Sequence, residues 1–157
     1  MITKHLLDSL TVSPYLKGSD ILDVGTGAGF PGIPLAIINP HKNFTLLDSS
    51  QKRIAFIKEA KRKLALTNVS AVHSRVEHFS GTRFTSISSR AFSSLDKMLS
   101  QTDHLIDNEG VWLAMKGVYP SDEIGRLADK YCLEESVPLC VPDLIAERYL
   151  LIIKHKG

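Results

Sequence analysis

The feature that most constrains the fold is a glycine turn directly after an apolar run, in residues 20–32 (DILDVGTGAGFPG). The run ends in Asp23 and Val24, and three glycines, Gly25, Gly27 and Gly29, follow at alternate positions. The pattern predicts a buried parallel strand and a tight turn, in which glycine lets a flat ligand lie against the backbone. Because the first βα turn of a doubly wound sheet binds nucleotide-like cofactors, we expect a cofactor site here.

The spacing of the glycines discriminates between cofactors. A dinucleotide fingerprint reads G-x-G-x-x-G, and counted from the first glycine its third position is Phe30. A frame that starts at Gly27 fits the spacing but puts Pro31 and Pro34 at the helix start, where a pyrophosphate needs free N–H groups. The form D-x-G-x-G-x-G resembles the first motif of S-adenosylmethionine-dependent methyltransferases. We therefore expect S-adenosyl-L-methionine, with another nucleotide or a structural turn as the alternatives.

Length and composition indicate an ordinary globular protein. The 157 residues, 43% of them hydrophobic, suffice for one domain with a real core. No apolar run is long enough to cross a membrane, and no signal peptide opens the chain, so we expect no membrane association. Cys132 and Cys140 are too few for a disulfide framework, which favours reduced thiols in the cytoplasm. The net charge of +2 is below that of a dedicated nucleic-acid binder. Whether the chain can bind nucleic acid therefore depends more on how its charges are distributed than on their sum.

Apolar strands alternate with helical patterns along the whole chain, which predicts an α/β fold with a mostly parallel sheet between helices. The expected strands are 20–25, 43–48, 70–75, 84–90, 110–116, 136–141 and 147–154. The expected helices are 3–10, 32–38, 51–65, 94–105 and 121–131. The last two strands follow each other without a helix, so we expect an antiparallel pair at one edge of the sheet. This is the usual end of the Rossmann-like class I methyltransferase fold.

The start of the chain looks like the end of an amphipathic helix with almost nothing in front of it. We expect residues 1–17 to be the remnant of an N-terminal helical region, and residues 1–157 to form a single methyltransferase domain.

Asp48 ends the second expected strand, 23 residues after Gly25. That spacing is close to the one expected of a carboxylate that accepts hydrogen bonds from both ribose hydroxyls of a cofactor. The alternative is a helix N-cap, for which Asp48, Ser49 and Ser50 are all suitable, and Asp48 could serve both roles.

Two further strand ends carry candidate binding residues. Residues after the third strand generally flank the adenine ring in such folds, which makes Val76 and Glu77 candidates, although a solvated loop acid is the plainer interpretation of Glu77. Arg90 ends the fourth strand, where the cofactor's methionine and the substrate must meet, and a guanidinium there can hold a carboxylate or a phosphate. A surface ion pair is the alternative for Arg90.

Missing motifs exclude several classes of methyl acceptor. Enzymes that methylate amino groups of bases usually carry N/D-P-P-Y/F after the fourth strand, where this chain has Ser-Arg-Ala-Phe. Methylation at carbon 5 of a pyrimidine needs a nucleophilic cysteine, for which Cys132 and Cys140 are not suitably placed. No Cys/His cluster has metal-ligand spacing, so we expect no metal. These absences favour an acceptor with a ready lone pair, such as guanine N7, which needs no general base; catalysis would then be mostly orientation.

Basic residues gather at Lys52, Arg53 and 58–63 (KEAKRK). The default interpretation is a solvent-exposed helix face. The more specific interpretation is a phosphate-binding surface, because Lys52 and Arg53 begin the helix near the edge of the sheet where the ligand is expected. Lys116 ends the fifth strand at the same edge. For His5 and Arg148, structural and RNA-binding roles are both open.

Taken together, these motifs resemble the RsmG (GidB) family of bacterial 16S ribosomal RNA methyltransferases. The matching segments are HLLDSL (5–10), DVGTGAGFPGIPLAI (23–37), FTLLDS with Lys52 and Arg53, SRVE (74–77), SRAF with Ser94 and Leu95, Lys116-Gly117 and Glu147-Arg148.

The resemblance implies a class I enzyme that methylates N7 of a guanine in small-subunit ribosomal RNA. It implies cofactor contacts at Gly25, Phe30, Asp48, Val76, Glu77 and Arg90. It also implies a helical N-terminal extension, of which we expect this chain to keep only the remnant at residues 1–17.

We expect 16S ribosomal RNA or the small ribosomal subunit particle as partner, phosphate contacts by Lys52, Arg53 and Arg75, and a monomer. The alternatives are a methyltransferase for a protein or small molecule, a cofactor-binding module without activity, and an NAD-dependent oxidoreductase.

Overall fold

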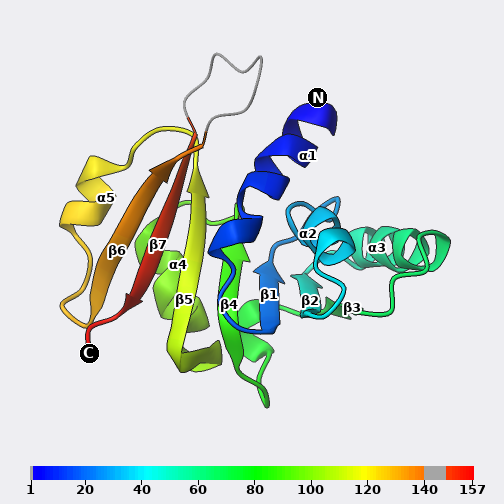
Figure 1. Cartoon of the computed structure of the whole chain (residues 1–157). Coiled ribbons are helices and arrows are strands. Elements are labelled where there is room, and N and C mark those ends of the chain that lie inside the picture. The colour runs from blue at the N-terminus through cyan, green and yellow to red at the C-terminus, as the bar shows by residue number, and fades with distance from the viewer. Residues whose placement is uncertain (1, 140–147) are drawn as a thin grey trace.

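The computed structural model describes residues 2–139 and 148–157, with side chains from residue 6 onward. Helices lie on both faces of one central sheet (Figure 1). The strands are β1 (Asp20–Val24), β2 (Asn43–Asp48), β3 (Val69–His73), β4 (Phe84–Ser89), β5 (Ile106–Lys116), β6 (Tyr131–Pro138) and β7 (Tyr149–His155). The helices are α1 (Ile2–Thr11), α2 (Gly32–Ile38), α3 (Gln51–Lys63), α4 (Leu95–Thr102) and α5 (Ser121–Gly125), and short 3-10 turns lie at Ser13–Tyr15, Val76–His78 and Asp103–Leu105.

The strand order β3-β2-β1-β4-β5-β7-β6 confirms the expected fold class. Strands β1 to β5 run parallel, and β7 pairs antiparallel with both β5 and β6, which is the expected antiparallel edge pair. Because β2 and β4 lie on opposite sides of β1, the chain reverses its direction of winding there. Such a switch point opens a crevice at the carboxyl ends of the strands.

Successive residues of the inner strands enter two separate cores, since side chains alternate along a strand. Trp112 packs on the face covered by α4, whereas its neighbour Leu113 packs on the face covered by α1, α2 and α3. Both residues are fully buried, as are Leu151 and its neighbour Leu150 on β7. The apolar runs of these inner strands are therefore buried on both faces of the sheet.

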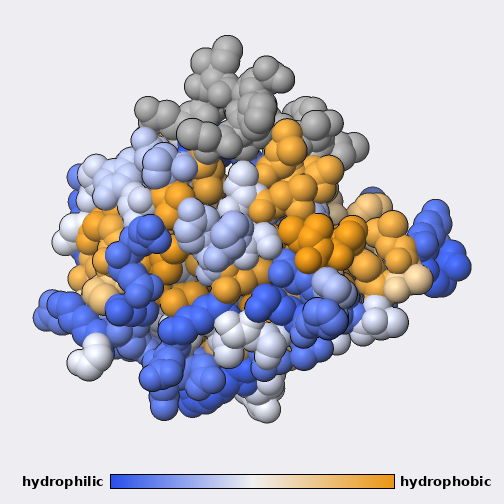
Figure 2. Space-filling view, in the orientation of Figure 1, coloured by the Kyte–Doolittle hydropathy of each residue, from blue (hydrophilic) through white to orange (hydrophobic). Residues whose placement is uncertain are grey.

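Apolar side chains also reach the surface over α1 and α2 (Figure 2), where Leu6, Ile37 and Ile38 are exposed.

The prediction of a helix over residues 121–131 was wrong in its second half. Helix α5 ends at Gly125, and β6 begins at Tyr131, five residues before the expected strand at 136. Tyr131 pairs with His155 of β7, and its ring packs edge-on against Trp112 at a centroid distance of 5.3 Å. Pairing along the whole of β7 therefore outweighs the local helical pattern.

The boundaries of the other helices and strands differ less from the predicted ones. Strand β5 begins at Ile106 rather than 110, and residues 103–105 form a 3-10 turn instead of the end of a helix. Strand β3 ends at His73, so Ser74 and Arg75 belong to the following loop. Cys140 and Glu147 lie outside the described residues.

Candidate functional site

A first cleft of about 250 Å³ opens at the carboxyl ends of β1, β2, β3 and β4. It lies at the switch point of the sheet, and it brings together segments that are more than sixty residues apart in the chain. The lining residues are Val24, Gly25, Leu47, Asp48, Ser49, Arg53, Ser74, Arg75, Val76, Glu77, Ala91 and Phe92. The glycine turn, the second strand's carboxylate and the segment after β3 therefore meet as expected.

Gly25 holds the turn close to its neighbouring strands. Its φ is +66°, a left-handed conformation that glycine tolerates best, and a Cβ at this position would lie 2.4 Å from the Cβ of Ala91. The N–H groups of Gly25 and Thr26 both donate to the carbonyl of Leu47, at 2.8 and 3.1 Å. A side chain at Gly25 would therefore obstruct the cleft wall.

The other two glycines have different surroundings. Gly27 has a φ of +58°, and a Cβ there would lie in ordinary contact with the carbonyl oxygen of Gly25 at 4.0 Å; Gly27 lines a neighbouring groove rather than the first cleft. Gly29 is buried, and a Cβ there would lie 2.5 Å from Cδ1 of Ile33. The geometry gives Gly29 a packing role, while Gly25 is the glycine of the three that reaches the first cleft.

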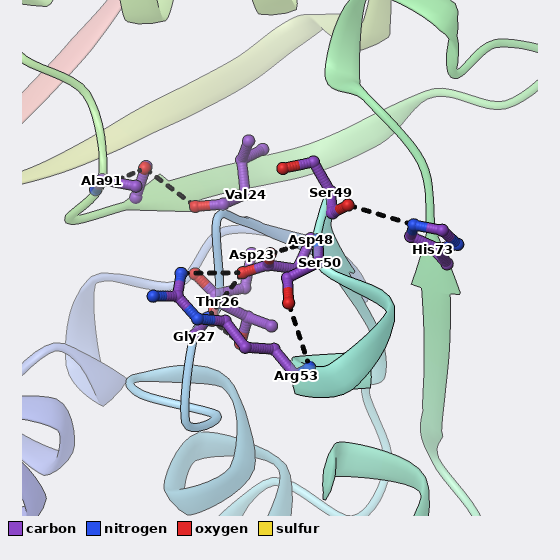
Figure 3. Close-up of polar contacts among 11 residues, drawn as sticks. Asp23, Val24, Thr26, Gly27, Asp48, Ser49, Ser50, Arg53, His73 and Ala91 are labelled. Carbon is purple, nitrogen blue, oxygen red and sulfur yellow. Dashed lines mark hydrogen bonds and ion pairs between the residues drawn. The ribbon is translucent and has the colours of Figure 1, made fainter. Parts of the chain in front are cut away.

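Asp48 joins the second strand to the glycine turn (Figure 3). Its side chain is only 4% exposed, and its Oδ2 accepts the N–H of Gly27 at 3.0 Å, while Oδ1 accepts the N–H of Ser50 at 2.8 Å. The N-cap of α3 is Ser50, whose Oγ accepts the N–H of Arg53, so Asp48 is not itself the cap. A carboxylate has about four acceptor positions, and two therefore remain for a ligand in the cleft.

Asp23 is a buried acid that was not among the predicted site residues. Its Oδ2 accepts from Thr26 Oγ1 at 2.8 Å and from the N–H of Gly32 at 3.1 Å, and its Oδ1 accepts from Ser88 Oγ at 3.3 Å. Burial raises the pKa of Asp23 to about 7, against the lowering effects of these hydrogen bonds and of the nearby Arg90 charge. The acid fixes both ends of the glycine turn. Its position as the first residue of the D-x-G-x-G-x-G pattern was the available signal.

Buried serines on β4 hold that strand against β1. Ser89 Oγ donates to the carbonyl of Val24 at 2.9 Å and accepts the N–H of Ala91 at 3.0 Å. These bonds set the path of the chain as it leaves β4, where Arg90 and Ala91 enter two different clefts. The serine-rich sequence SISS (86–89) was the signal that could have shown this role.

The segment after β3 supplies one wall of the first cleft. Val76 is buried and offers an apolar surface, whereas Arg75 and Glu77 are exposed at the rim. Phe30, by contrast, is half-buried just before the cis peptide bond to Pro31 and does not line this cleft. The adenine-side candidates therefore lie in the cleft, and Phe30 lies apart from it.

A second cleft, of about 310 Å³, lies next to the first at the end of β4. Its lining residues are Asp8, Arg90, Met115, Lys116, Gly117, Leu139, Arg148 and Tyr149. Three different strands or strand ends thus each contribute one predicted cation to this cleft: Arg90, Lys116 and Arg148.

Acidic partners hold two of these cations in place. Arg148 Nε lies 3.3 Å from Asp8 Oδ2, and Lys116 Nζ lies 3.3 Å from Glu123 Oε1, which also accepts the N–H of Leu95 at 2.8 Å. Asp8 is 1% exposed, and its Oδ1 has no hydrogen-bond partner among the described residues. Sequence reasoning did not single out Asp8, although it stands in the HLLDSL segment.

The remaining predicted RNA contacts lie around the first cleft. Arg53 and Arg75 line it, and Arg53 Nη1 lies 3.9 Å from Asp48 Oδ2 (Figure 3), while Lys52 is exposed one residue earlier on α3. His5 belongs to α1, and its side chain is not among those described. Across residues 2–139 and 148–157 there is no group of side chains suited to hold a metal ion. In the same part of the chain, no helix has the length and apolar character needed to span a membrane.

Comparison with known proteins shows the family. Residues 1–152 match the family model described as GidB, rRNA small subunit methyltransferase G. A curated relative from Haemophilus influenzae (strain PittGG), named "Ribosomal RNA small subunit methyltransferase G", is 52% identical over 155 residues, which are 98% of this chain and 76% of that protein.

Solved structures share the fold at low sequence identity. The structure of M. capricolum TrmK in complex with the natural cofactor product S-adenosyl-homocysteine superposes with a TM-score of 0.71 at 15% identity, covering 94% of this chain and 67% of that one. The Pyrococcus abyssi tRNA (uracil-54, C5)-methyltransferase in complex with S-adenosyl-L-homocysteine gives 0.71 at 18% identity, covering 92% and 36%. With a class I methyltransferase fold and a family match over nearly its whole length, the chain belongs to the GidB family of rRNA small subunit methyltransferase G.

Proposed function

We propose that this protein transfers the methyl group of S-adenosylmethionine to N7 of a guanine in 16S ribosomal RNA. The observation that carries the proposal is the family match over residues 1–152, which includes every segment that builds the two clefts. The guanine N7 position rests on the resemblance and on the absence of amino-methylating and cysteine motifs.

The first cleft fits the adenosine part of the cofactor. Asp48 has acceptor positions left for the two ribose hydroxyls, and Gly25 leaves the space that a Cβ would fill. The apolar side chains of Val24, Leu47 and Val76 offer surfaces on which an adenine ring can lie. When bound, the cofactor supplies an activated methyl group on a sulfonium.

The second cleft fits the acceptor nucleotide. Arg90 directly precedes Ala91 of the first cleft, so a base in the second cleft lies next to the place where the methionine end of the cofactor would extend. Arg90, Lys116 and Arg148 outnumber the acids Asp8 and Glu123 that pair with two of them, and this excess of positive charge suits RNA phosphate. Guanine N7 has a lone pair and loses no proton on methylation. The residues therefore need only hold and orient the base.

We further propose that the chain acts as a single-domain monomer in the cytoplasm, where ribosomal RNA is made. Its substrate is free 16S ribosomal RNA or the small-subunit particle. Light scattering on the purified chain measures the mass, and methylation of both substrates in parallel identifies the preferred one.

Deletion of the gene tests the acceptor. An N7-methylated guanine carries a positive charge, and its ring is labile to borohydride followed by aniline, which cleaves the RNA chain. Small-subunit RNA from the deletion strain should lose one such cleavage site. Incubation of that RNA with the purified protein and S-adenosylmethionine should restore it.

Calorimetric titration with S-adenosylmethionine, S-adenosylhomocysteine and NAD tests the cofactor separately. Binding of the first two without NAD is expected. If S-adenosylmethionine binds but the deletion strain keeps every aniline-sensitive guanine, then the acceptor is a different one and the ribosomal N7 assignment is wrong.

A further inference from the structure

A groove of about 490 Å³ lies beside the first cleft, between the glycine turn and the start of α3. Its lining residues are Gly27, Ala28, Ser50, Lys52, Arg53 and Phe56. Arg53 also lines the first cleft, so the two depressions share a wall. A molecule in the groove would therefore lie next to the proposed cofactor site.

Helix α3 concentrates the positive charge of the protein. It carries six lysines and arginines against one acid, Glu59, whereas the whole chain has a net charge of only +2. Glu59 is itself neutralised by Arg62, whose Nη2 lies 2.6 Å from Glu59 Oε1. The hydrophilic right-hand end of α3 is visible at the edge of the molecule (Figure 2). Such a surface suits a polyanion.

An aromatic ring lies within this basic surface. Phe56 is 57% exposed, while Ile54 and Ile57 on the same helix are buried and anchor it to the sheet. Residues three and four apart on a helix are neighbours, so Lys52 and Arg53 flank Phe56 one turn towards the helix start. An exposed ring next to cations is the arrangement that proteins use to stack an unpaired base and hold its phosphates.

We propose that this groove binds a single-stranded RNA segment next to the target guanine, with a base stacked on Phe56 and phosphates on Lys52 and Arg53. The proposal rests on the proposed function and adds the form of RNA that the protein selects. A duplex could meet the same cations, but its bases are already stacked on each other and cannot stack on the ring. An acidic protein partner would need a wider apolar surface than one ring bordered by charges.

Binding of short fluorescent oligonucleotides tests the stacking. Phe56→Ala should weaken the affinity for single-stranded oligoadenylate at least about fivefold and leave the affinity for an RNA duplex unchanged. Phe56→Tyr should bind like the parent, because it keeps the aromatic face. Lys52→Ala should weaken binding to both. Ile38→Ala removes an apolar side chain on α2 that is 48% exposed and lies outside the basic helix, and it should change neither affinity.

A tryptophan at position 56 gives a direct signature. The single native tryptophan, Trp112, is fully buried, so an exposed indole in Phe56→Trp would report separately. Oligoadenylate should quench its fluorescence, and the duplex should not.

Equal affinity of Phe56→Ala and the parent for oligoadenylate overturns the proposal, as does an equal loss for single strand and duplex. Another result also overturns the proposal: Phe56→Ala methylates assembled small subunits poorly, yet it binds oligoadenylate and methylates protein-free RNA like the parent. That result would show that a ribosomal protein contacts the ring. If the parent methylates no ribosomal RNA, the proposed function fails, while the oligonucleotide and fluorescence readouts still decide the groove.

Discussion

At the residue scale, Asp48 combines a structural and a binding role. Its two oxygens accept the N–H groups of Gly27 and Ser50 at 3.0 and 2.8 Å, which fixes the glycine turn against the start of α3. The same carboxylate lines the first cleft, and these two bonds leave it acceptor positions for a ligand there. Loss of the carboxylate should therefore affect both the shape of the cleft and its affinity.

The Asp48→Ala variant should bind S-adenosylmethionine at least about tenfold more weakly, since each charge-assisted hydrogen bond contributes on the order of 1.5–3 kcal/mol. Calorimetric titration measures this change. Ser50→Ala is the matched control: it removes the α3 cap, costs about 1 kcal/mol of stability and keeps the cofactor affinity. Unchanged affinity in Asp48→Ala together with a lower free energy of unfolding would leave only the structural role.

Asp23 predicts a pH dependence of stability. Burial raises its pKa from 3.8 in the unfolded chain to about 7 in the folded protein. Between these values the folded state keeps a proton that the unfolded state has released, so the free energy of unfolding should fall as the pH rises through this range. The fall ends about one pH unit above 7, where the folded state has also lost its proton, and its size is on the order of 4 kcal/mol.

Asp23→Asn should remove this fall, because the amide has no proton to lose and can still accept from Thr26 and Gly32. Urea unfolding at several pH values compares the variant with the parent. Identical pH profiles for the two proteins would contradict the inferred burial cost.

How far the sequence predicts the site differs from residue to residue. The spacing from Gly25 to Asp48 correctly predicts that both line one cleft, because a local motif followed by the next strand end determines it. The contacts of Asp8 with Arg148, 140 residues apart, and of Asp23 with Ser88, 65 apart, depend on which strands become neighbours. Periodicity within a segment contains no information on such pairs.

At the element scale, local patterns predict the elements well until pairing with a distant strand competes. Helix α2 begins and ends at the expected residues 32 and 38, whereas the helix expected up to residue 131 ends at Gly125. Residues 131–138 pair along β7 instead, and the pairing lets Tyr131 OH donate to Asp103 Oδ1 at 2.7 Å. The free energy of that distant pairing cannot be read from the segment itself.

Asn68 shows how one side chain stabilises the connection between elements. Its Nδ2 lies 3.0, 3.1 and 3.0 Å from the carbonyl oxygens of Ala36, Asn39 and Lys42, at the end of α2 and in the loop to β2. A helix end leaves its last carbonyls without partners, and this amide supplies them. The contact keeps α2, and with it the glycine turn, in register with β2.

Asn68→Ala should lower the free energy of unfolding by about 1–3 kcal/mol, because partly buried carbonyls lose their donor. Asn68→Asp should cost more, since a carboxylate cannot donate and its charge faces three carbonyl oxygens. Urea denaturation measures both. Asn43→Ala, which removes a long and exposed contact to Asp20 at 3.5 Å, is the control and should change little. Equal stability of the two Asn68 variants and the parent would contradict this role.

At the scale of the whole molecule, the average charge hides the distribution that matters. The net charge of +2 describes the chain, yet Arg90, Lys116 and Arg148 share one cleft and α3 carries six further cations. The strand order brings the first group together, because β4, β5 and β7 are consecutive neighbours in the sheet. The fold therefore converts cations spread through the sequence into two basic surfaces, one on each side of the first cleft.

Arg90 connects the first and second clefts, since it precedes Ala91 of the first cleft and lines the second. If its guanidinium holds a phosphate or carboxylate with two parallel hydrogen bonds, Arg90→Ala should lower kcat/KM for methyl transfer to 16S ribosomal RNA by roughly ten- to a hundredfold. Arg90→Lys should lower it less, because lysine keeps the charge but not the planar pair of donors. Transfer of tritiated methyl groups measures the rates.

The free energy of unfolding of both Arg90 variants separates this role from a structural one. Arg90 also lowers the pKa of the buried Asp23, so its removal should shift the pH at which stability falls to a higher value, and lysine should largely prevent that shift. A loss of activity in Arg90→Ala that follows its loss of stability would make Arg90 a structural residue. Equal rates for parent, alanine and lysine variants would remove it from the site altogether.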